Sequence, residues 1–302
     1  MFFSKGGEAG GMILPEFDVL VPDSLEQAAT LLDQYGPEGA MVMAGGTDLI
    51  VRMKEGALRP GKIILLEKIE SLKGISSSKK TIRIGALTTF GEIIHSEEIR
   101  KKAPLLADAC RNIGAPQLWH RGTIGGNIAN ASPCADAVTA LVALEAEAIL
   151  VSKRGERRLP LNRCFKGPKE TFFHSSEILT YMEFAIPEEP QNCFYLSLGQ
   201  RKALAIHKLS VACQMVFNEN GTVQKACVAY GAVAPTVLRG KKVERYLKGK
   251  KLTSVVLAHS AGLAELEVSP IDDIRSTAEY RRRMTGVLLR RGLESLINKN
   301  AK

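Results

Sequence analysis

A glycine-rich stretch near the middle of the chain strongly limits its fold. Residues 121–136 read RGTIGGNIANASPCAD, with three glycines and few large side chains between two more apolar regions. Ser132 can cap a helix and Pro133 suits its first position, and apolar residues follow at helical spacing from Val138. We therefore expect a loop that leads directly into a helix.

A second glycine turn has the same chemistry. The residues AGGTD, 44–48, follow a predicted strand, and GTIGGNIANASP, 122–133, precedes a helix. Glycine lets several backbone N–H groups approach one anion, because it lacks a Cβ and adopts positive φ without strain. A diphosphate suits such a pair of turns. Side chains that could bond phosphate or sugar oxygens are Thr47, Thr123, Asn127, Ser132 and Asp136.

Neither turn fits the two common nucleotide motifs. G-x-G-x-x-G opening a βαβ unit does not describe them, nor does G-x-x-x-x-G-K-[ST]. A single glycine pair is more often an ordinary turn than a ligand site. The presence of two such pairs in one chain favours a ligand site only modestly. The residues by themselves predict a diphosphate-bearing, dinucleotide-like ligand.

No catalytic constellation stands out. The five histidines are far apart, the six cysteines lack C-x-x-C spacing, and no G-x-S-x-G occurs. We predict buried free thiols, no catalytic side chain and no metal site. A ligand cradle without an evident acid, base or metal is expected where a bound cofactor does the chemistry.

The composition indicates a globular protein. Of its 302 residues 45% are hydrophobic, and no run reaches the roughly 18 apolar residues of a membrane span. The formal net charge is +9, but the basic residues are mixed with acids and lack interleaved aromatics. We predict no nucleic-acid partner and a basic surface that faces an acidic partner subunit. The N-terminus lacks the order of a secretory signal, which predicts a cytoplasmic protein.

Patterning along the chain predicts several segments. A helix capped by Ser24 and ended by Gly36 precedes the first glycine turn, and short strands alternate with helices beyond it. After residue 192, a three-stranded antiparallel sheet and two helices are expected. The last helix, capped by Ser276, carries an arginine-rich face, either solvated or facing a partner. The expected segments are a flexible extension at 1–11, with Met12 as a second candidate start, and units at 12–67, 68–188 and 193–302.

Five segments, in order, resemble the FAD-binding subunit of the molybdenum hydroxylases, the medium subunits of xanthine dehydrogenase and carbon monoxide dehydrogenase. They are AGGTDLIVRMK, GTIGGNIANASPCAD, EILTYMEFAIP, GQRKALAIHKLSVA and STAEYRRRMTGVLLRRGLE. The pattern T-x-G-G-N-I-x-x-A-S-P-x-x-D is a specific signal. The resemblance covers roughly residues 12–295.

The resemblance implies an α+β fold of the vanillyl-alcohol-oxidase (PCMH) type. Two α+β subdomains, 12–67 and 68–188, would hold FAD without a covalent bond, and the C-terminal domain, 193–302, would carry the three-stranded sheet and helices. Backbone N–H groups of the first turn would wrap the diphosphate and the second turn would complete the grip. The residues it places at FAD are Val42, Met43, Ala44, Gly45, Gly46, Thr47, Asp48, Leu49, Thr123, Gly125, Gly126, Asn127, Ser132, Asp136, Leu179 and Ile206.

Three of these carry distinct roles in the family. Asp136 would bond the ribityl or ribose hydroxyls, Leu179 would lie against the isoalloxazine, and Ile206 would sit where electrons leave or enter the ring. This chain departs from the family in two places nearby. Trp119 replaces a usual arginine, and Ala205 and His207 flank Ile206 where many members read Asp-Ile-Ala, which argues against NAD as acceptor. The cysteine-bearing insertion for a [4Fe–4S] cluster is absent, which disfavours the 4-hydroxybenzoyl-CoA reductase branch.

The resemblance also implies a complex. In this family a molybdopterin large subunit oxidises the substrate, an iron–sulfur small subunit relays electrons through two [2Fe–2S] centres, and the FAD subunit passes them to an external acceptor, NAD or another. The chain is thus expected to be a xanthine dehydrogenase-like oxidoreductase subunit. A stand-alone FAD-dependent reductase of the same fold and a non-catalytic scaffold stay open, and the sequence indicates neither substrate nor stoichiometry.

Overall fold

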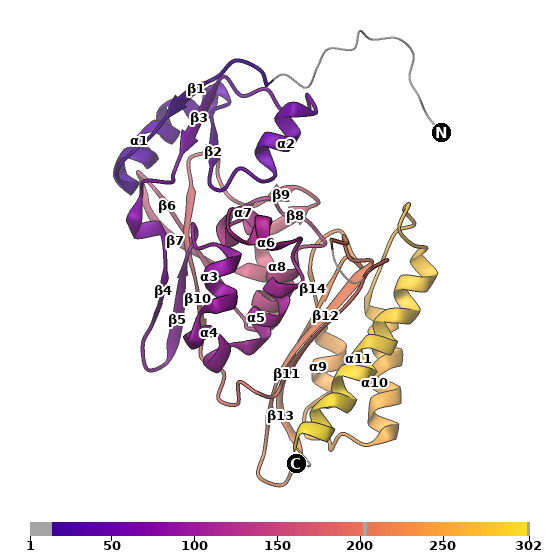
Figure 1. Ribbon diagram of the computed structural model, residues 1–302. Helices are drawn as coiled ribbons and strands as arrows, with labels where there is room; N and C mark the ends of the chain where they lie inside the picture. The colour runs from indigo at the N-terminus through magenta and orange to yellow at the C-terminus, as the bar shows by residue number, and fades with distance from the viewer. Residues whose placement is uncertain (1–13, 202–203, 301–302) are drawn as a thin grey trace.

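The computed structural model describes residues 14–201 and 204–300, and the extension expected at 1–11 lies outside them. Figure 1 shows an N-terminal part drawn in indigo, a central part in magenta and a C-terminal sheet covered by yellow and orange helices. Strands and helices are mixed in each part, which confirms the predicted α+β class. No helix among the described residues combines the length and apolar character needed to cross a membrane.

The N-terminal part is a small parallel sheet with two helices. The strand order is β1-β3-β2, and both pairings are parallel. The hydroxyl of Ser24 accepts the Gln27 N–H at 3.1 Å and Gly36 follows the last helical residue, so both predicted helix ends are confirmed. The elements are β1 (Asp18–Leu20), α1 (Leu25–Tyr35), η1 (Gly36–Glu38), β2 (Met41–Met43), α2 (Leu49–Lys54), β3 (Lys62–Leu65) and η2 (Glu70–Leu72).

The central part is a five-stranded antiparallel sheet in the order β4-β5-β10-β6-β7. Side chains of the sheet and of helices α3, α5, α7 and α8 form one buried core. The predicted hairpin at 147–160 is confirmed as β6 and β7. The elements are β4 (Ile75–Ser77), β5 (Thr81–Gly85), α3 (Phe90–His95), α4 (Glu97–Lys102), α5 (Pro104–Arg111), α6 (Pro116–Trp119), α7 (Ile124–Ala129), α8 (Asp136–Ala143), β6 (Glu147–Ser152), β7 (Gly155–Pro160), η3 (Leu161–Arg163), β8 (Phe165–Gly167), β9 (Glu170–Thr171) and β10 (Ile178–Ala185).

The glycine-rich stretch is not the simple loop that was expected. Thr123 caps a short helix, α7, by accepting the Gly126 N–H at 3.1 Å, and α8 begins only at Asp136. The prediction that Ser132 caps the following helix is wrong, because its hydroxyl accepts the Cys134 N–H instead. Thr123 has the extended backbone of a cap at the earlier position, and this extra turn of helix shortens the loop.

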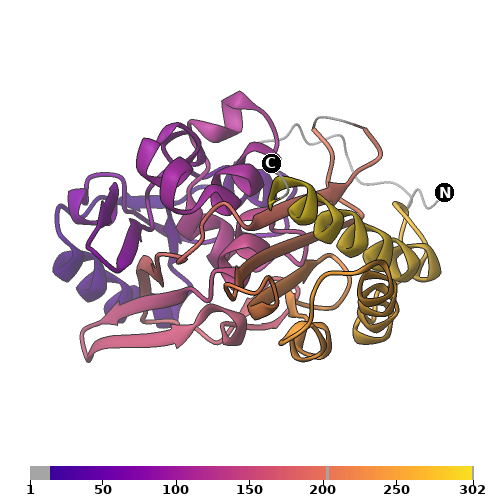
Figure 2. The ribbon, with the colours of Figure 1, turned by 90° about the horizontal axis from the view of Figure 1, so that it is seen from below.

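The C-terminal part is an antiparallel sheet in the order β11-β12-β13-β14. Helices α5 and α8 of the central part pack on one side of it and α11 on the other, as the two views show (Figures 1 and 2). Because both faces are covered, β12 is a nearly continuous run of buried residues rather than an alternating one. The elements are β11 (Cys193–Leu198), β12 (Leu209–Phe217), β13 (Val223–Gly231), β14 (Leu238–Arg239), α9 (Lys241–Leu247), α10 (Ser254–Glu267) and α11 (Ala278–Asn300).

Three details of this part differ from expectation. Among the described residues three helices, α9, α10 and α11, follow the sheet, where the pattern predicts two. The two-residue strand β14 adds a fourth strand to the three that the pattern predicts. The prediction that Ser276 caps the last helix is wrong, since Thr277 accepts the Tyr280 N–H at 3.2 Å while the Ser276 N–H donates to Asp273. Thr277 directly precedes the first helical residue, whereas Ser276 belongs to the preceding turn.

We predict that Gly292→Ala lowers the free energy of unfolding by about 1–3 kcal/mol, because overpacking strains a filled core. A Cβ at Gly292 on α11 would lie 2.1 Å from the ring of Phe194 on β11. The matched control is Gly262→Ala in α10, where a Cβ meets nothing within 4 Å, and the gain in helix propensity is about 0.5–1 kcal/mol. Urea unfolding measures both, and equal midpoints would contradict the close approach of α11.

Candidate functional site

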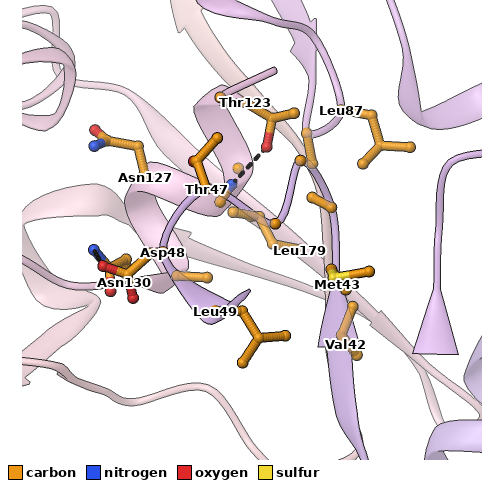
Figure 3. A pocket seen from close by; sticks show the side chains of 18 of the residues that line it. Val42, Met43, Thr47, Asp48, Leu49, Leu87, Thr123, Asn127, Asn130 and Leu179 are labelled. Atoms are coloured by element: carbon orange, nitrogen blue, oxygen red, sulfur yellow. Dashed lines mark hydrogen bonds between the residues drawn. The ribbon is translucent and has the colours of Figure 1, made fainter. Parts of the chain in front are cut away.

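A cavity of about 420 Å³ lies between the N-terminal and central parts. Residues 41–49 of β2, the first glycine turn and α2 form one wall, and the start of α7 forms the facing wall. Leu179 of β10 completes the lining (Figure 3). Both glycine turns therefore meet at one pocket, although they are about 75 residues apart in the chain.

The first turn is shaped to receive an anion. Gly46 has φ +74°, the left-handed region where a Cβ is strained. A Cβ on Gly45 would lie 1.7 Å from the carbonyl oxygen of Arg121, so the two turns touch backbone to backbone. No described residue accepts a hydrogen bond from the backbone N–H of Gly45, Gly46 or Thr47. Three successive donors thus remain available at the pocket wall.

The second turn contributes differently from what was expected. Three of its N–H groups are already used within the protein: Ile124 donates to Thr88, Gly125 to Ala86 at 2.9 Å, and Gly126 to the Thr123 hydroxyl. The second turn therefore brings a close backbone surface and side chains rather than free amides.

Asn127 provides an independent sign of a polar ligand. Its side chain is on α7 and lines the pocket, and its Oδ1 is buried without a hydrogen-bond partner among the described residues. A buried polar atom without a partner costs stability, so such atoms are rare unless a ligand pairs with them. Together with the glycine wall, this orphaned oxygen fits a phosphate- and hydroxyl-bearing cofactor.

The charged residues of the pocket wall are few. Glu177 is held by two bonds from Arg157, from Nε at 2.7 Å and Nη2 at 2.6 Å. Burial opposes the ionised form of Glu177, but these bonds lower its pKa below the ordinary value. Asp48 and Arg52 are the other two charged residues of the wall.

Most of the predicted cofactor residues lie at this pocket. Those that line it are Val42, Met43, Ala44, Gly45, Gly46, Thr47, Asp48, Leu49, Thr123, Gly125, Gly126, Asn127 and Leu179. Ser132, Asp136 and Ile206 do not. Ile206 is 64% exposed, in the segment before β12.

Asp136 is part of a buried network instead. Its Oδ1 accepts a short hydrogen bond from the Tyr195 hydroxyl and lies 2.7 Å from Nδ1 of His207. Burial, with the negative charge of Asp136, raises the pKa of Tyr195 well above its ordinary value. The network joins the first turn of α8 to β11 and to the segment before β12.

Sequence reasoning missed several wall residues. They are mostly apolar and come from scattered elements, so their spacing resembles that of ordinary core residues. The main ones are Arg52, Phe90, Ile113, Leu118, Phe173, Glu177 and Ile178. A second cavity, of about 620 Å³, shares Ala44, Gly45, Leu87 and Thr123 with the first and so extends the space around the glycine turns.

None of the six cysteines forms a disulfide, and all but the half-buried Cys134 are buried. Burial raises the pKa of the Cys164 thiol to about 12, which keeps it protonated and unreactive. The described residues contain no group of three or more histidine, cysteine or acidic side chains that could hold a metal ion.

These features define an FAD-binding subunit of the PCMH type. Residues 15–188 match the family described as FAD binding domain in molybdopterin dehydrogenase, and residues 194–296 match the CO dehydrogenase flavoprotein C-terminal domain. The chain belongs to the family of FAD-binding medium subunits of the molybdenum hydroxylases, and its cofactor is FAD, as the resemblance implied.

Known proteins similar to the chain agree with this. It is 32% identical to the carbon monoxide dehydrogenase medium chain of Hydrogenophaga pseudoflava, over 94% of this chain and 98% of that one. It is 28% identical to the xanthine dehydrogenase FAD-binding subunit of Escherichia coli, over 85% and 90%. A structure of carbon monoxide dehydrogenase from Hydrogenophaga pseudoflava superposes with a TM-score of 0.90 at 31% identity, covering 95% of this chain and 99% of that one. The chain is therefore an oxidoreductase subunit. Its relatives include subunits of both carbon monoxide dehydrogenase and xanthine dehydrogenase, so they do not confirm the xanthine-like specificity expected from the sequence.

We predict that Asn127→Ala separates stability from cofactor affinity. Removing the unpartnered oxygen should leave the free energy of unfolding of the apo-protein unchanged or raise it by about 1 kcal/mol. FAD affinity should fall roughly ten-fold, because one polar contact to the cofactor is lost. Chemical unfolding of apo-protein and fluorescence titration with FAD measure the two effects. A less stable apo-protein with unchanged FAD affinity would show that Oδ1 serves the fold alone.

Proposed function

We propose that this chain is the electron-transferring subunit of a molybdenum hydroxylase complex. It receives electrons from the [2Fe–2S] clusters of a small subunit, which takes them from a molybdopterin large subunit, and delivers them to an external acceptor. The observation that carries this is the row of free N–H groups in the first cavity, whose two carboxylates are both paired with cations. FAD, when bound, supplies the exchange between paired and single electrons.

The roles of the individual residues follow from the pocket. We infer that the N–H groups of Gly45, Gly46 and Thr47 bind the diphosphate and that Asn127 bonds a phosphate or ribityl hydroxyl. Leu179, buried on β10, lies against the ring and excludes water from it. A contact of Asp136 with the sugar hydroxyls is proposed from the resemblance alone, because Asp136 does not line the cavity and its Oδ1 is shared by Tyr195 and His207.

The partner subunits are proposed on the relatives' names alone. Medium chains of carbon monoxide and glyceraldehyde dehydrogenases share about the same identity with this chain. In this arrangement the substrate is bound by the large subunit, so we propose no substrate. We place the complex in the cytoplasm, because buried cysteines without disulfides suit a reducing compartment. NAD is disfavoured as acceptor by the residues that flank Ile206.

The alternative, a stand-alone reductase, needs an acid at the pocket to protonate its product. The two carboxylates of the first cavity, Asp48 and Glu177, are both paired with cations, and no histidine lines it. This observation favours the electron-transfer role.

We predict that Gly126→Val abolishes retention of FAD through purification. A Cβ at Gly126 meets only the Thr123 hydroxyl, at 2.9 Å, so the fold should form while the side chain closes the approach to the phosphates. The control is Gly61→Val, where a Cβ meets nothing within 4 Å. Visible absorption and circular dichroism measure flavin content and folding. Normal flavin content in Gly126→Val would disprove the proposed cradle.

We predict that the isolated FAD-loaded chain is bleached by dithionite but does not oxidise xanthine, carbon monoxide or an aldehyde. A tagged copy expressed with its partners should co-purify with iron and molybdenum, measured by elemental analysis. Turnover of a small substrate by the isolated chain would instead support the stand-alone reductase.

A further inference from the structure

Both carboxylates in the wall of the FAD pocket are paired with a cation that lies outside that wall. Arg157 forms an ion pair with Glu177, and Lys169 forms an ion pair with Asp48, with an Nζ–Oδ1 distance of 3.1 Å. The remaining charged wall residue, Arg52, has no side-chain hydrogen bond or ion pair with another described residue. The pocket therefore presents one unopposed positive charge, which suits a doubly negative diphosphate.

Lys169 reaches Asp48 from 121 positions further along the chain. Its Nζ also lies 2.6 Å from Oδ1 of Asn130, whose Nδ2 donates to Asp48 Oδ1 at 3.1 Å. Figure 3 shows Asp48 and Asn130 side by side at the pocket. The backbone at Lys169 is left-handed, φ +65°, and its N–H donates to the carbonyl of Ala131 at 2.9 Å. The turn between β8 and β9 is thereby held against the end of α7 with its lysine over Asp48.

This ion pair contributes little to folding. The side chains of Lys169 and Asp48 are 42% and 43% exposed, and ion pairs at such sites are weak. Its position gives it another role. Asp48 directly follows the turn of free N–H groups, so an uncompensated carboxylate there would repel the phosphates over a short distance.

We propose that Lys169 is a positioning residue for FAD binding and acts through Asp48. It neutralises and holds the Asp48 carboxylate so that the first glycine turn can accept the diphosphate. The inference rests on the proposed placement of the diphosphate at this turn.

The test is a double-mutant cycle on the FAD dissociation constant, measured by fluorescence titration of the full-length apo-protein. Lys169→Met should weaken binding roughly ten-fold, because it exposes the phosphates to the Asp48 charge. Asp48→Asn removes the repelling charge, so adding Lys169→Met to Asp48→Asn should cause no further loss of affinity. Raising the ionic strength should shrink the defect of Lys169→Met.

Two variants serve as controls. Lys166→Met removes the same charge from the same hairpin, where Nζ lies 5.3 Å from the Phe172 ring and not at the pocket, and should bind FAD as wild type does. Lys169→Arg keeps the charge and should retain most of the affinity. Thermal unfolding of the apo-proteins should show no difference among these variants.

Equal affinities for Lys169→Met and Lys166→Met would overturn the inference, and so would a further loss of affinity when Lys169→Met is added to Asp48→Asn. Failure of the proposed cradle gives a different result. In that case Gly126→Val would retain FAD, whatever the Lys169 variants do.

Discussion

The contact between the backbones of Gly45 and Arg121 determines the geometry of the pocket. No side chain fits there, since a Cβ on Gly45 would overlap the Arg121 carbonyl, and a Cβ on Gly125 would lie 2.5 Å from that of Ala86. The first contact presses the turn after β2 against the segment just before α7, and the second presses α7 against the residue that follows β5. The N-terminal sheet and the central sheet are thereby fixed close together, and the free N–H groups lie at the junction.

The two glycine turns contribute to the cofactor site in different ways. The first keeps its donors unpaired, because its residues are in neither a helix nor a strand. The second uses its donors to fasten α7 to the segment 86–88 and gives the pocket a rigid wall with Asn127 on it. A rigid wall facing a row of donors lowers the ordering cost of binding, since the site is formed before the ligand arrives.

Features set by local chemistry could be predicted from the sequence. The cap at Ser24, the stop at Gly36 and the hairpin at 147–160 depend on neighbouring residues, as does the strand that leads into AGGTD. The cap at Ser276 was wrong because the neighbouring Thr277 takes that role. The cap at Ser132 was wrong because α8 begins only at Asp136, after Ala135, which provides no side-chain cap. The resemblance to a family supplied the fold class and the cofactor.

Features that join distant segments could not be predicted. Strand β14 has two residues and no pattern of its own, and the apolar wall residues look like any core residue. The ion pair between Asp48 and a lysine in a later hairpin cannot be predicted from the residues that neighbour either one in the sequence. Only the folded chain shows that both carboxylates of the pocket wall are paired with cations.

The buried link between Asp136, Tyr195 and His207 has a mechanical consequence. It ties the helix that follows the glycine-rich stretch to the C-terminal sheet, at a point where that sheet is enclosed between two helical layers. Swinging the C-terminal part away from the cradle would break buried polar bonds. The outer helices, which pack on the same sheet, are consequently held in a fixed position relative to the FAD cavity.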